Sequence, residues 1–366
     1  MSRAQRWAET MSGQSTSNGV RQAHDGGDRI LVGPAKVLDR EGREAVEEAS
    51  LTPGATRAVG SGRRAHPEQP DPWRTCFERD RDRILHSAAF RRLAGKTQVF
   101  IFPADHQRTR LTHALEVTQV ASAIARACRL NVALVEAVAL GHDCGHGPGG
   151  HASEDALGVF IPDFDHAVWG ADVTAAPLNL CAETLDGIRN HSWSRPSPST
   201  PEGQVVGLAD RVAYCAHDLE DACHAGIVTE ADLPIEIAEL CGRARSDQLE
   251  AFITDIVETV VRTGTIGMSE PMGQALAGLR HFNHERIYLR PESVQQAANV
   301  IGMLRALVDH YAGRPADLPV AASAGADPVW DAVAYVDGMT DRFACLQAVS
   351  LLGWSEDRLP RGHDVG

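Results

Sequence analysis

The residues best able to do chemistry crowd into one stretch, LGHDCGHGPGGHASE at residues 140 to 154. It contains three His, one Cys and two acids among several glycines. Imidazole and carboxylate groups bind divalent cations and transfer protons near neutral pH, so a metal site and a catalytic turn are both open. The glycine spacing also matches a dinucleotide-binding loop, which is a third interpretation.

Two nucleotide-binding patterns in the chain are weak. A G-x-G-x-x-G loop must follow a β-strand, but the segment before Gly145 is typical of a helix and Pro148 lies inside the turn. The sequence AGKT at 94 to 97 resembles the tail of a Walker A loop, yet the first glycine of that motif would fall on Phe90. We therefore predict neither a Rossmann loop nor a P-loop.

Helical periodicity indicates which of these side chains point inward. In NVALVEAVALGHD, the residues Val135, Val138, Ala139 and His142 recur at i, i+3, i+4 and i+7, which is one face of a helix. His142 therefore extends an apolar face. The segment TRLTHALEVTQVASAIARAC repeats the pattern and carries His113 on its apolar side.

A further helix is predicted from about Gln204 to Ala225, after a loop over residues 195–203. Asp210 lies on this helix. Polar side chains follow it at spacings that keep them near the same face: Tyr214, His217, Asp218 and Asp221. Such a face is also compatible with simple exposure to solvent.

An adjacent His-Asp pair at the end of an apolar helix is costly to bury unless something satisfies both groups. A divalent cation bound by His142, Asp143, His113 and Asp210 would do so. Mixed imidazole and carboxylate ligands suit Mn, Fe, Ni, Co or hydrated Mg better than a structural Zn site. Each residue alone fits an ordinary polar role, but four in the order H…HD…D on helices favour a metal site.

Composition limits the class of protein. With 366 residues and 43% hydrophobic residues, the chain can form one large domain or two small ones. The formal charge of −14 argues against a general nucleic-acid coat protein. Eight scattered Cys without a CxxC pair, an opening without an apolar signal core and the absence of a long apolar run predict a reduced, cytoplasmic protein with no membrane span.

The chain divides into three predicted regions. Residues 1–70 are rich in Gly, Ser, Arg, Glu and Pro, which predicts a flexible or partly ordered extension, although RILVGPAKVL could form a short strand or hairpin. Residues 73–226 hold the candidate ligands in helices. Residues 227–366 are predicted to form a C-terminal helical region packed on that core, with a break near 313–328.

Five sequence blocks resemble the HD-domain phosphohydrolases, and within them the deoxyguanosinetriphosphate triphosphohydrolase-like branch related to the SAM-and-HD-domain dNTPases. These blocks are RDRDRILHSAAFRRLAGKTQVF (79–100), RTRLTHALEVTQVASAIAR (108–126), HDCGHGPGGHASEDAL (142–157), LADRVAYCAHDLEDA (208–222) and GMTDRFA (338–344). They cover most of the chain from about 73 to 350. The resemblance implies an all-α fold, with an HD-domain helical core and a smaller C-terminal helical extension.

The resemblance also implies an activity. A divalent metal ion would activate water for attack on the α-phosphorus of a deoxynucleoside triphosphate, giving nucleoside and tripolyphosphate. The implied metal ligands are His113, His142, Asp143 and Asp210. Relatives form hexamers or tetramers and several are activated by nucleotides, so the resemblance implies a homo-oligomer and a possible nucleotide activator.

Further residues take their expected roles from matching positions. His151 and Glu154 match the catalytic pair that delivers a proton to the leaving 5′-oxygen, three residues apart at the start of a helix. His146 and His166 match active-site histidines that contact phosphate or assist the acid. Residues 79–113 hold eight Lys or Arg against three Asp, a local excess of positive charge suited to a triphosphate.

The remaining matches concern the substrate. Arg110 matches a phosphate-binding arginine. Tyr214 and Asp218 match residues that pack on the sugar and hydrogen-bond its 3′-hydroxyl, an arrangement that disfavours a 2′-hydroxyl. Gln98 and Val99 resemble the segment that lies against the nucleoside.

Two departures from the family pattern lie near the expected substrate. AVWGADVT at 167–174 replaces a polar helix start, and Gly149 replaces the usual aromatic residue. We expect the second change to loosen or enlarge the loop near His151. A base other than guanine, or a modified nucleotide, becomes a reasonable substrate.

Two other functions stay open. The same metal core could serve a nucleotidase acting on monophosphates, or a regulatory nucleotide or nucleic-acid binder without turnover. His151 and Glu154 argue against a pure binder, which needs no acid pair. A cyclic-dinucleotide phosphodiesterase is disfavoured because the GYP extension is absent.

Overall fold

The computed structural model describes residues 2–10, 13–15, 19–24, 36–104, 106–319 and 327–362. Contacts divide the chain into two compact units, Met1–Leu38 and Asp39–Gly366. In the small unit, helix α1 (Arg3–Thr10) is followed by the antiparallel pair β1 (Gln14–Ser15) and β2 (Arg21–Gln22). Most of RILVGPAKVL, for which the sequence predicts a strand or hairpin, lies outside the described residues.

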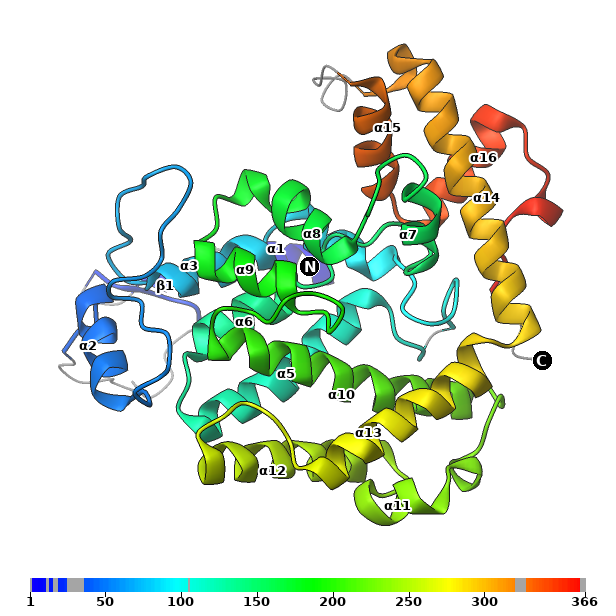
Figure 1. Ribbon diagram of the computed structural model, residues 1–366. Coiled ribbons are helices and arrows are strands. Elements are labelled where there is room, and N and C mark those ends of the chain that lie inside the picture. The colour runs from blue at the N-terminus through cyan, green and yellow to red at the C-terminus, as the bar shows by residue number, and fades with distance from the viewer. Residues whose placement is uncertain are drawn as a thin grey trace. The chain divides into compact units, whose positions relative to one another are not determined.

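The large unit is built from helices, and the predicted all-α fold is confirmed (Figure 1). Its α-helices are α2 (Arg40–Ser50), α3 (Cys76–Leu85), α4 (Ala88–Arg92), α5 (Arg110–Cys128), α6 (Val132–Gly141), α7 (Ala152–Leu157), α8 (His166–Trp169), α9 (Ala182–Asn190), α10 (Pro201–His224), α11 (Ile235–Cys241), α12 (Arg245–Thr263), α13 (Glu270–Asn283), α14 (Pro291–Gly313), α15 (Pro328–Asp337) and α16 (Asp341–Leu352). Short helical turns are η1 (Leu93–Gly95), η2 (Gly170–Thr174), η3 (Ala176–Leu178), η4 (Glu230–Asp232), η5 (His284–Tyr288), η6 (Pro315–Asp317) and η8 (Glu356–Arg358). Of these, η2 and η5 are π-helical.

Capping residues set the ends of the helices that carry the site. Thr109 and Thr112 form a capping box at the start of α5, and Asn131 caps α6. Thr200 caps α10, and Pro201 occupies its first turn, where a missing N–H costs nothing. For this reason α10 begins before the predicted Gln204.

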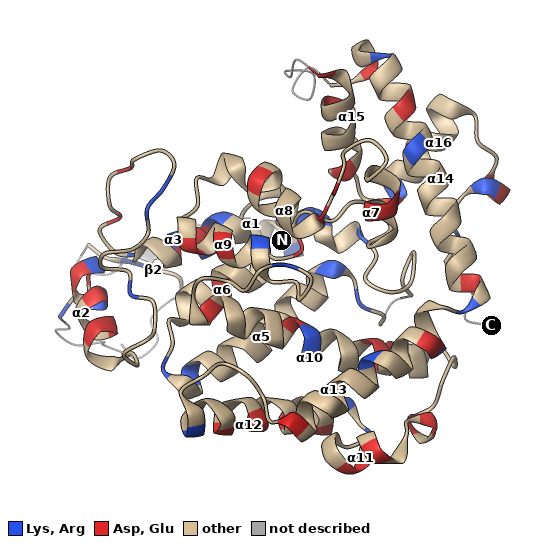
Figure 2. Ribbon diagram, in the orientation of Figure 1, with Lys and Arg blue, Asp and Glu red and all other residues tan. Residues whose placement is uncertain are grey.

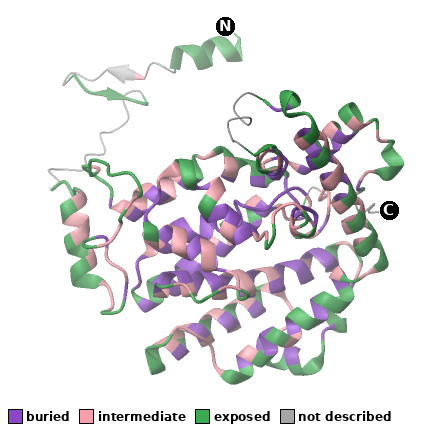
Figure 3. Cartoon of the chain, turned by 45° about the horizontal axis from the view of Figure 1, so that its top comes forward, coloured by how far each residue is buried: buried purple, intermediate pink, exposed green. Residues whose placement is uncertain are grey.

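Three apolar clusters form the core of the large unit. The first joins α5, α6, α10, α12 and α13, the second joins α7 with α14, α15 and α16, and the third joins α3, α4 and the end of α6 to Ile188 of α9. Figure 3 shows buried residues gathered in the middle of this unit and exposed residues along its outer helices. The inward faces predicted for α5 and α6 are confirmed, since Val117, Val120, Val135 and Val138 are fully buried.

Charge lies mainly on the outside of the large unit. Figure 2 shows Asp and Glu along α2, α11 and α12, where they outnumber Lys and Arg. No helix in the described ranges is both long enough and apolar enough to cross a membrane. Residues 39–70 group with the helical core by their contacts, and the predicted boundaries at 70 and 226 stay predictions.

Candidate metal centre and active site

Three neighbouring helices place the predicted metal ligands. His113 lies in the first turn of α5 and faces inward. His142 and Asp143 follow the last turn of α6, and Asp210 lies in the middle of α10. His113, His142 and Asp143 are buried, and the Asp210 side chain keeps a small exposed fraction toward the cavity. The structure therefore brings together the four residues that the H…HD…D pattern predicts.

The distances between these ligand atoms fit a single divalent cation. Two donors about 2.1 Å from one cation lie about 3.0 Å apart at right angles and about 4.2 Å apart when opposite. His113 Nε2 lies 3.0 Å from Asp210 Oδ1 and 4.0 Å from Asp143 Oδ2. His142 Nε2 lies 3.6 Å from Asp210 Oδ1 and 3.5 Å from Asp143 Oδ1. Each of these four separations falls within the range for two donors on one cation.

The hydrogen bonding of His142 points to the same use. Its Nδ1–H donates to the carbonyl oxygen of Ala139 at 2.7 Å, which leaves a free lone pair on Nε2. This Nε2 is buried without a hydrogen-bond partner among the described residues. A buried, unpaired lone pair aimed at carboxylates is costly, and a cation would satisfy it. The residues present therefore fit a divalent metal ion.

The electrostatics keep both carboxylates ionised. Burial opposes ionisation of Asp143, but Arg110, His142 and His146 outweigh it and hold its pKa well below the usual value. Burial likewise raises the pKa of Asp210, and the hydrogen bond with His113 turns the net shift downward. Charged carboxylates are the form that binds a cation.

The predicted acid pair lies beside the metal ligands. His151 immediately precedes α7, and its Nδ1–H donates to Glu154 Oε2 at 3.3 Å. Glu154 Oε1 accepts a hydrogen bond from His166 Nδ1 at 2.6 Å, so one carboxylate holds two histidines. The His151 side chain is 74% exposed, whereas His166 is buried. His166 is therefore enclosed beside the cavity, while His151 faces into it.

Burial and hydrogen bonds set the pKa values of this group. Burial raises the pKa of Glu154, but hydrogen bonds from His151 and His166 lower it far more. Burial lowers the pKa of His166, and the hydrogen bond to Glu154 reverses this, so that it ends above the ordinary value. His146 stacks on His166 with ring centroids 3.7 Å apart. Burial, and next the positive charge of Arg110, hold the pKa of His146 well below the ordinary value.

The glycine turn between α6 and α7 is closed. A Cβ on Gly145 would lie 2.1 Å from the carbonyl oxygen of His166, so this position requires the close approach of two backbones. The turn follows a helix, which confirms that it is no Rossmann loop. Gly149 has φ +75°, and a Cβ there would lie 2.5 Å from Val300 Cγ1. The expectation that Gly149 loosens or enlarges the loop is therefore wrong, because Val300 of α14 fills that space.

The predicted sugar-binding residues share a second part of the site. The Tyr288 hydroxyl donates a hydrogen bond to Asp218 Oδ2, while Asp218 Oδ1 is buried and has no partner in the described chain. Burial raises the pKa of Asp218 to about 7, against the opposing effect of Tyr288. Arg280 Nε donates to the Tyr214 hydroxyl at 3.0 Å. His217 and Asp221, predicted on the same face, are buried but do not line the cavity.

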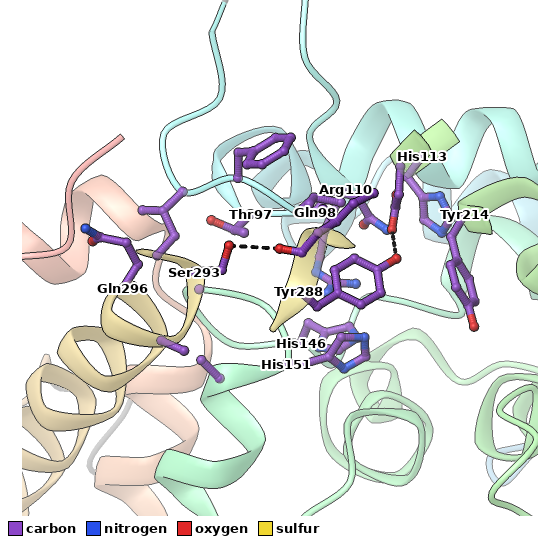
Figure 4. Close-up of a pocket in the computed structure, with 18 of the residues that line it drawn as sticks. Thr97, Gln98, Arg110, His113, His146, His151, Tyr214, Tyr288, Ser293 and Gln296 are labelled. Carbon is purple, nitrogen blue, oxygen red and sulfur yellow. Dashed lines mark hydrogen bonds between the residues drawn. The ribbon is translucent and has the colours of Figure 1, made fainter. Parts of the chain in front are cut away.

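One cavity of about 850 Å³ joins most of these groups (Figure 4). Gln98, Arg110, His146 and Tyr288 project into it from separate segments. Val99 also lines it, as do His113, Asp143, His151, His166, Asp210, Tyr214 and Asp218. His142 and Glu154 do not line the cavity, but His142 Nε2 lies 3.5 Å from Asp143 Oδ1 and Glu154 accepts hydrogen bonds from His151 and His166.

The sequence patterns did not predict several residues that line the cavity. They are His191, Trp193, Arg211, Arg280, His284 and Tyr288. His191 had a usable signal, because Thr184, Ile188 and His191 recur at helical spacing and all are buried. Arg280, His284 and Tyr288 recur every four residues, which is also one helical face.

Comparison with known proteins gives consistent matches. Residues 110–215 match the family model of the HD domain, and residues 266–349 match that of the phosphohydrolase-associated domain. A deoxyguanosinetriphosphate triphosphohydrolase-like protein of Caldanaerobacter subterraneus subsp. tengcongensis is 38% identical over 322 residues, covering 84% of this chain and 94% of that protein. Proteins of the same description from Desulfatibacillum aliphaticivorans and Clostridium perfringens are 42% and 40% identical, covering 74% and 76% of this chain and 83% and 86% of their own lengths.

Proposed function

Because the chain belongs to the deoxyguanosinetriphosphate triphosphohydrolase-like family of HD-domain phosphohydrolases, we propose that it hydrolyses a deoxynucleoside triphosphate at the α-phosphorus. The products would be a nucleoside and tripolyphosphate. HD domains are metal-dependent, and the His and Asp cluster of this chain could hold the ion. The proposed ligands are His113, His142, Asp143 and Asp210, with Mn, Mg, Fe, Co or Ni as the candidate ion.

The observation that carries the proposal is the shared cavity. Its volume of about 850 Å³ lies within the usual range for sites that enclose a small molecule. The metal ligands, the acid pair, five arginines and the Tyr214 and Asp218 pair all line it or contact its lining. A nucleoside triphosphate is the ligand class that would use each of these groups at once.

When bound, the metal ion would activate water and offset negative charge at the α-phosphate. The protein supplies a cation of its own at that point. Arg110 NH1 donates to Asp143 Oδ2 at 2.6 Å, but its Nε and NH2 are buried without partners in the described residues. Two free donors on a buried guanidinium suit phosphate oxygens, which bind arginine in a two-pronged geometry.

The leaving 5′-oxygen needs a proton, and we propose that His151 delivers it. Its Nδ1–H bond to Glu154 fixes the ring, which leaves Nε2 as the atom that carries and releases the proton into the cavity. Glu154 stays ionised because two histidines donate to it. His146 and His166 stack on each other, and both rings lie edge-on to His151. These two rings would form the wall that faces the phosphates.

The sugar and base would lie toward Tyr288 and Gln98. Asp218 Oδ1, the unpaired oxygen, is positioned to accept a hydrogen bond from a 3′-hydroxyl, with Tyr288 holding the other oxygen. Tyr214 would lie under the ribose and exclude a 2′-hydroxyl. Gln98 Oε1 is buried and unpaired among the described residues, so it is available to the nucleoside.

The test is a product analysis. The protein is incubated with Mn²⁺ or Mg²⁺ and with a panel of dNTPs, NTPs and dNMPs, and the phosphate product is identified. Tripolyphosphate together with nucleoside is the expected result. Orthophosphate from monophosphates would instead identify a nucleotidase, and orthophosphate or pyrophosphate from triphosphates would overturn the proposal. Light scattering with and without dNTP measures the proposed homo-oligomer and its response to a nucleotide activator.

A further inference from the structure

One arginine of the cavity has no charged partner. Arg211 directly follows the proposed metal ligand Asp210 on α10, and it lines the cavity. Arg110, by contrast, is paired with Asp143. Within the described part of the chain, the guanidinium of Arg211 meets two aromatic rings but neither a carboxylate nor a hydrogen-bond acceptor. In a chain with a formal charge of −14, this free cation is available to an anionic ligand in the cavity.

The two aromatic rings hold the Arg211 side chain. Its Cζ lies over the Trp193 ring, 4.1 Å from the ring centroid, and 5.7 Å from the centroid of the Tyr214 ring. A guanidinium that lies over a ring is attracted through its flat face. Its N–H donors point outward in the plane of the group, so this contact leaves them free. Trp193 therefore fixes the position of the cation without using any of its hydrogen-bond donors.

The Trp193 ring is itself fixed to the same helix. Its Nε1–H donates to the carbonyl oxygen of Gly207 at 2.8 Å, one turn before Arg211. A Cβ on Gly207 would lie 2.7 Å from the carbonyl oxygen of His191, so the segment that carries Trp193 lies directly against α10. Trp193 is nevertheless 51% exposed and lines the cavity. A ring this exposed contributes little to the core, and its specific side-chain contact is with Arg211.

The substrate class proposed above supplies an anion for Arg211. The α-phosphate would lie at the metal ion, where Arg110 offers two free donors. The two outer phosphates carry most of the charge of a triphosphate, and other cations must bind them. Arg211 is next to a proposed metal ligand in the sequence and has its donors free, so it suits phosphate oxygens.

We propose that Trp193 is a positioning residue, which holds the Arg211 guanidinium toward the outer phosphates and so favours triphosphates over monophosphates. The inference rests on the proposed function, because it assigns the binding of the outer phosphates of that substrate. Trp193 acts through Arg211 and touches no reacting atom.

The test measures phosphate binding directly and needs no turnover. Tripolyphosphate and a dNMP are titrated separately into the full-length protein in a calorimeter, with Mg²⁺ in excess so that chelation is the same in every titration. We expect Trp193→Ala to weaken tripolyphosphate binding about 10-fold and to leave dNMP binding unchanged. With a dNTP as substrate, KM should rise about 10-fold while kcat changes little, because the ring contributes to binding and not to the chemical step.

Further variants separate the ring from a general structural role. Trp193→Phe retains a ring face and should keep the tripolyphosphate affinity within about threefold of the wild type. Arg211→Ala should lose at least as much affinity as Trp193→Ala, and Trp193→Ala should have no further effect in that background. Trp73→Ala is the matched control and should change neither affinity, because Trp73 is 54% exposed and does not line this cavity. Circular dichroism checks the fold, and Arg211→Ala decides the matter if Trp193→Ala does not fold.

The opposite results would overturn the inference. They are an unchanged tripolyphosphate affinity in Trp193→Ala or Arg211→Ala, equal weakening of tripolyphosphate and dNMP binding, or a further loss from Trp193→Ala in the Arg211→Ala background. A Trp193→Phe variant as weak as Trp193→Ala would assign the effect to the Gly207 hydrogen bond and would also overturn it. The proposed function fails separately, when the wild-type chain releases orthophosphate or pyrophosphate; a wild-type chain that binds no tripolyphosphate would overturn both.

Discussion

Replacing Gly149 by Ala tests whether α14 closes the glycine turn beside the acid pair. Gly149 adopts φ +75°, and an added Cβ would lie 2.5 Å and 2.9 Å from the two methyl carbons of Val300. Normal contact distances are about 3.5 to 4.0 Å. The left-handed backbone costs about 1 to 2 kcal/mol, and overpacking against buried Val300 adds about 1 to 3 kcal/mol. We therefore expect the free energy of unfolding to fall by about 2 to 5 kcal/mol.

Gly226→Ala is the matched control. Gly226 has φ +68°, and no atom lies within 4 Å of its added Cβ, so only the backbone cost applies. Denaturant unfolding of both variants isolates the contribution of Val300, expected at about 1 to 3 kcal/mol. In a double-mutant cycle, Val300→Ala should relieve Gly149→Ala with a coupling of about 1 kcal/mol or more. Equal losses for the two glycine variants, or no coupling, would refute the packing argument.

The same variant should affect turnover. The Gly149 N–H donates to Asp341 Oδ1 at 2.8 Å, and His151 follows two residues later. A displacement of about 1 Å can lower a rate about 100-fold, so we expect kcat to fall about 10- to 100-fold in Gly149→Ala and to stay unchanged in Gly226→Ala. Unchanged kcat in both would show that the turn does not position the acid.

Three further predictions concern the proposed chemistry. His151→Ala should lower kcat by about 100- to 10,000-fold while calorimetry shows retained nucleotide binding; unaltered turnover would remove His151 from the mechanism. Burial raises the pKa of Asp218 from 3.8 to about 7, so the folded chain holds this proton more tightly than the unfolded chain does. The resulting stability is complete below about pH 4 and is lost as the pH rises through 7, by at most about 1.4 kcal/mol per pH unit. Asp218→Asn should lack this slope, and parallel unfolding curves against pH would contradict the assignment. Chelation should abolish hydrolysis and lower the melting temperature. The free energy of unfolding should fall by about 2.7 kcal/mol when the ion was present at 100 times its Kd. Mn²⁺ or Mg²⁺ should restore activity and stability, and a chelator-resistant activity would exclude a metal mechanism.

The helices, and the proximity of the four proposed metal ligands, could be predicted because their signals are local. Val135, Val138 and Ala139 repeat at helical spacing, and His142 continues their face, so burial of that face forces His142 inward. His113 follows the same logic on α5. Short motifs in a fixed order then supply the link between helices that periodicity alone does not give.

The rest of the site depends on contacts between distant parts of the chain. Tyr288, at the end of the π-helical turn that continues α13, donates its hydroxyl proton to Asp218 of α10. Val300 fills the space beside Gly149 although about 150 residues of sequence separate them. A sequence pattern within one segment carries no information about such pairs, which is why the Gly149 loop was expected to be open.

The C-terminal helices are joined to the site by a group of buried hydrogen bonds. Lys96, from the AGKT sequence, donates its ammonium protons to the backbone carbonyls of His146 and Asp337. Asp341, at the start of α16, accepts hydrogen bonds from the Thr97 hydroxyl at 2.6 Å and from the Gly149 N–H. Lys96 and Thr97, which resemble part of a phosphate-binding loop, thus bind other parts of the protein and not a phosphate. Through Asp341 they connect the cavity wall before α5 to the turn that carries the acid pair. Since a buried ammonium left without its partners is strongly destabilising, α15 and α16 are needed to keep both walls in place. Residues from the HD match and from the phosphohydrolase-associated match therefore line one cavity together.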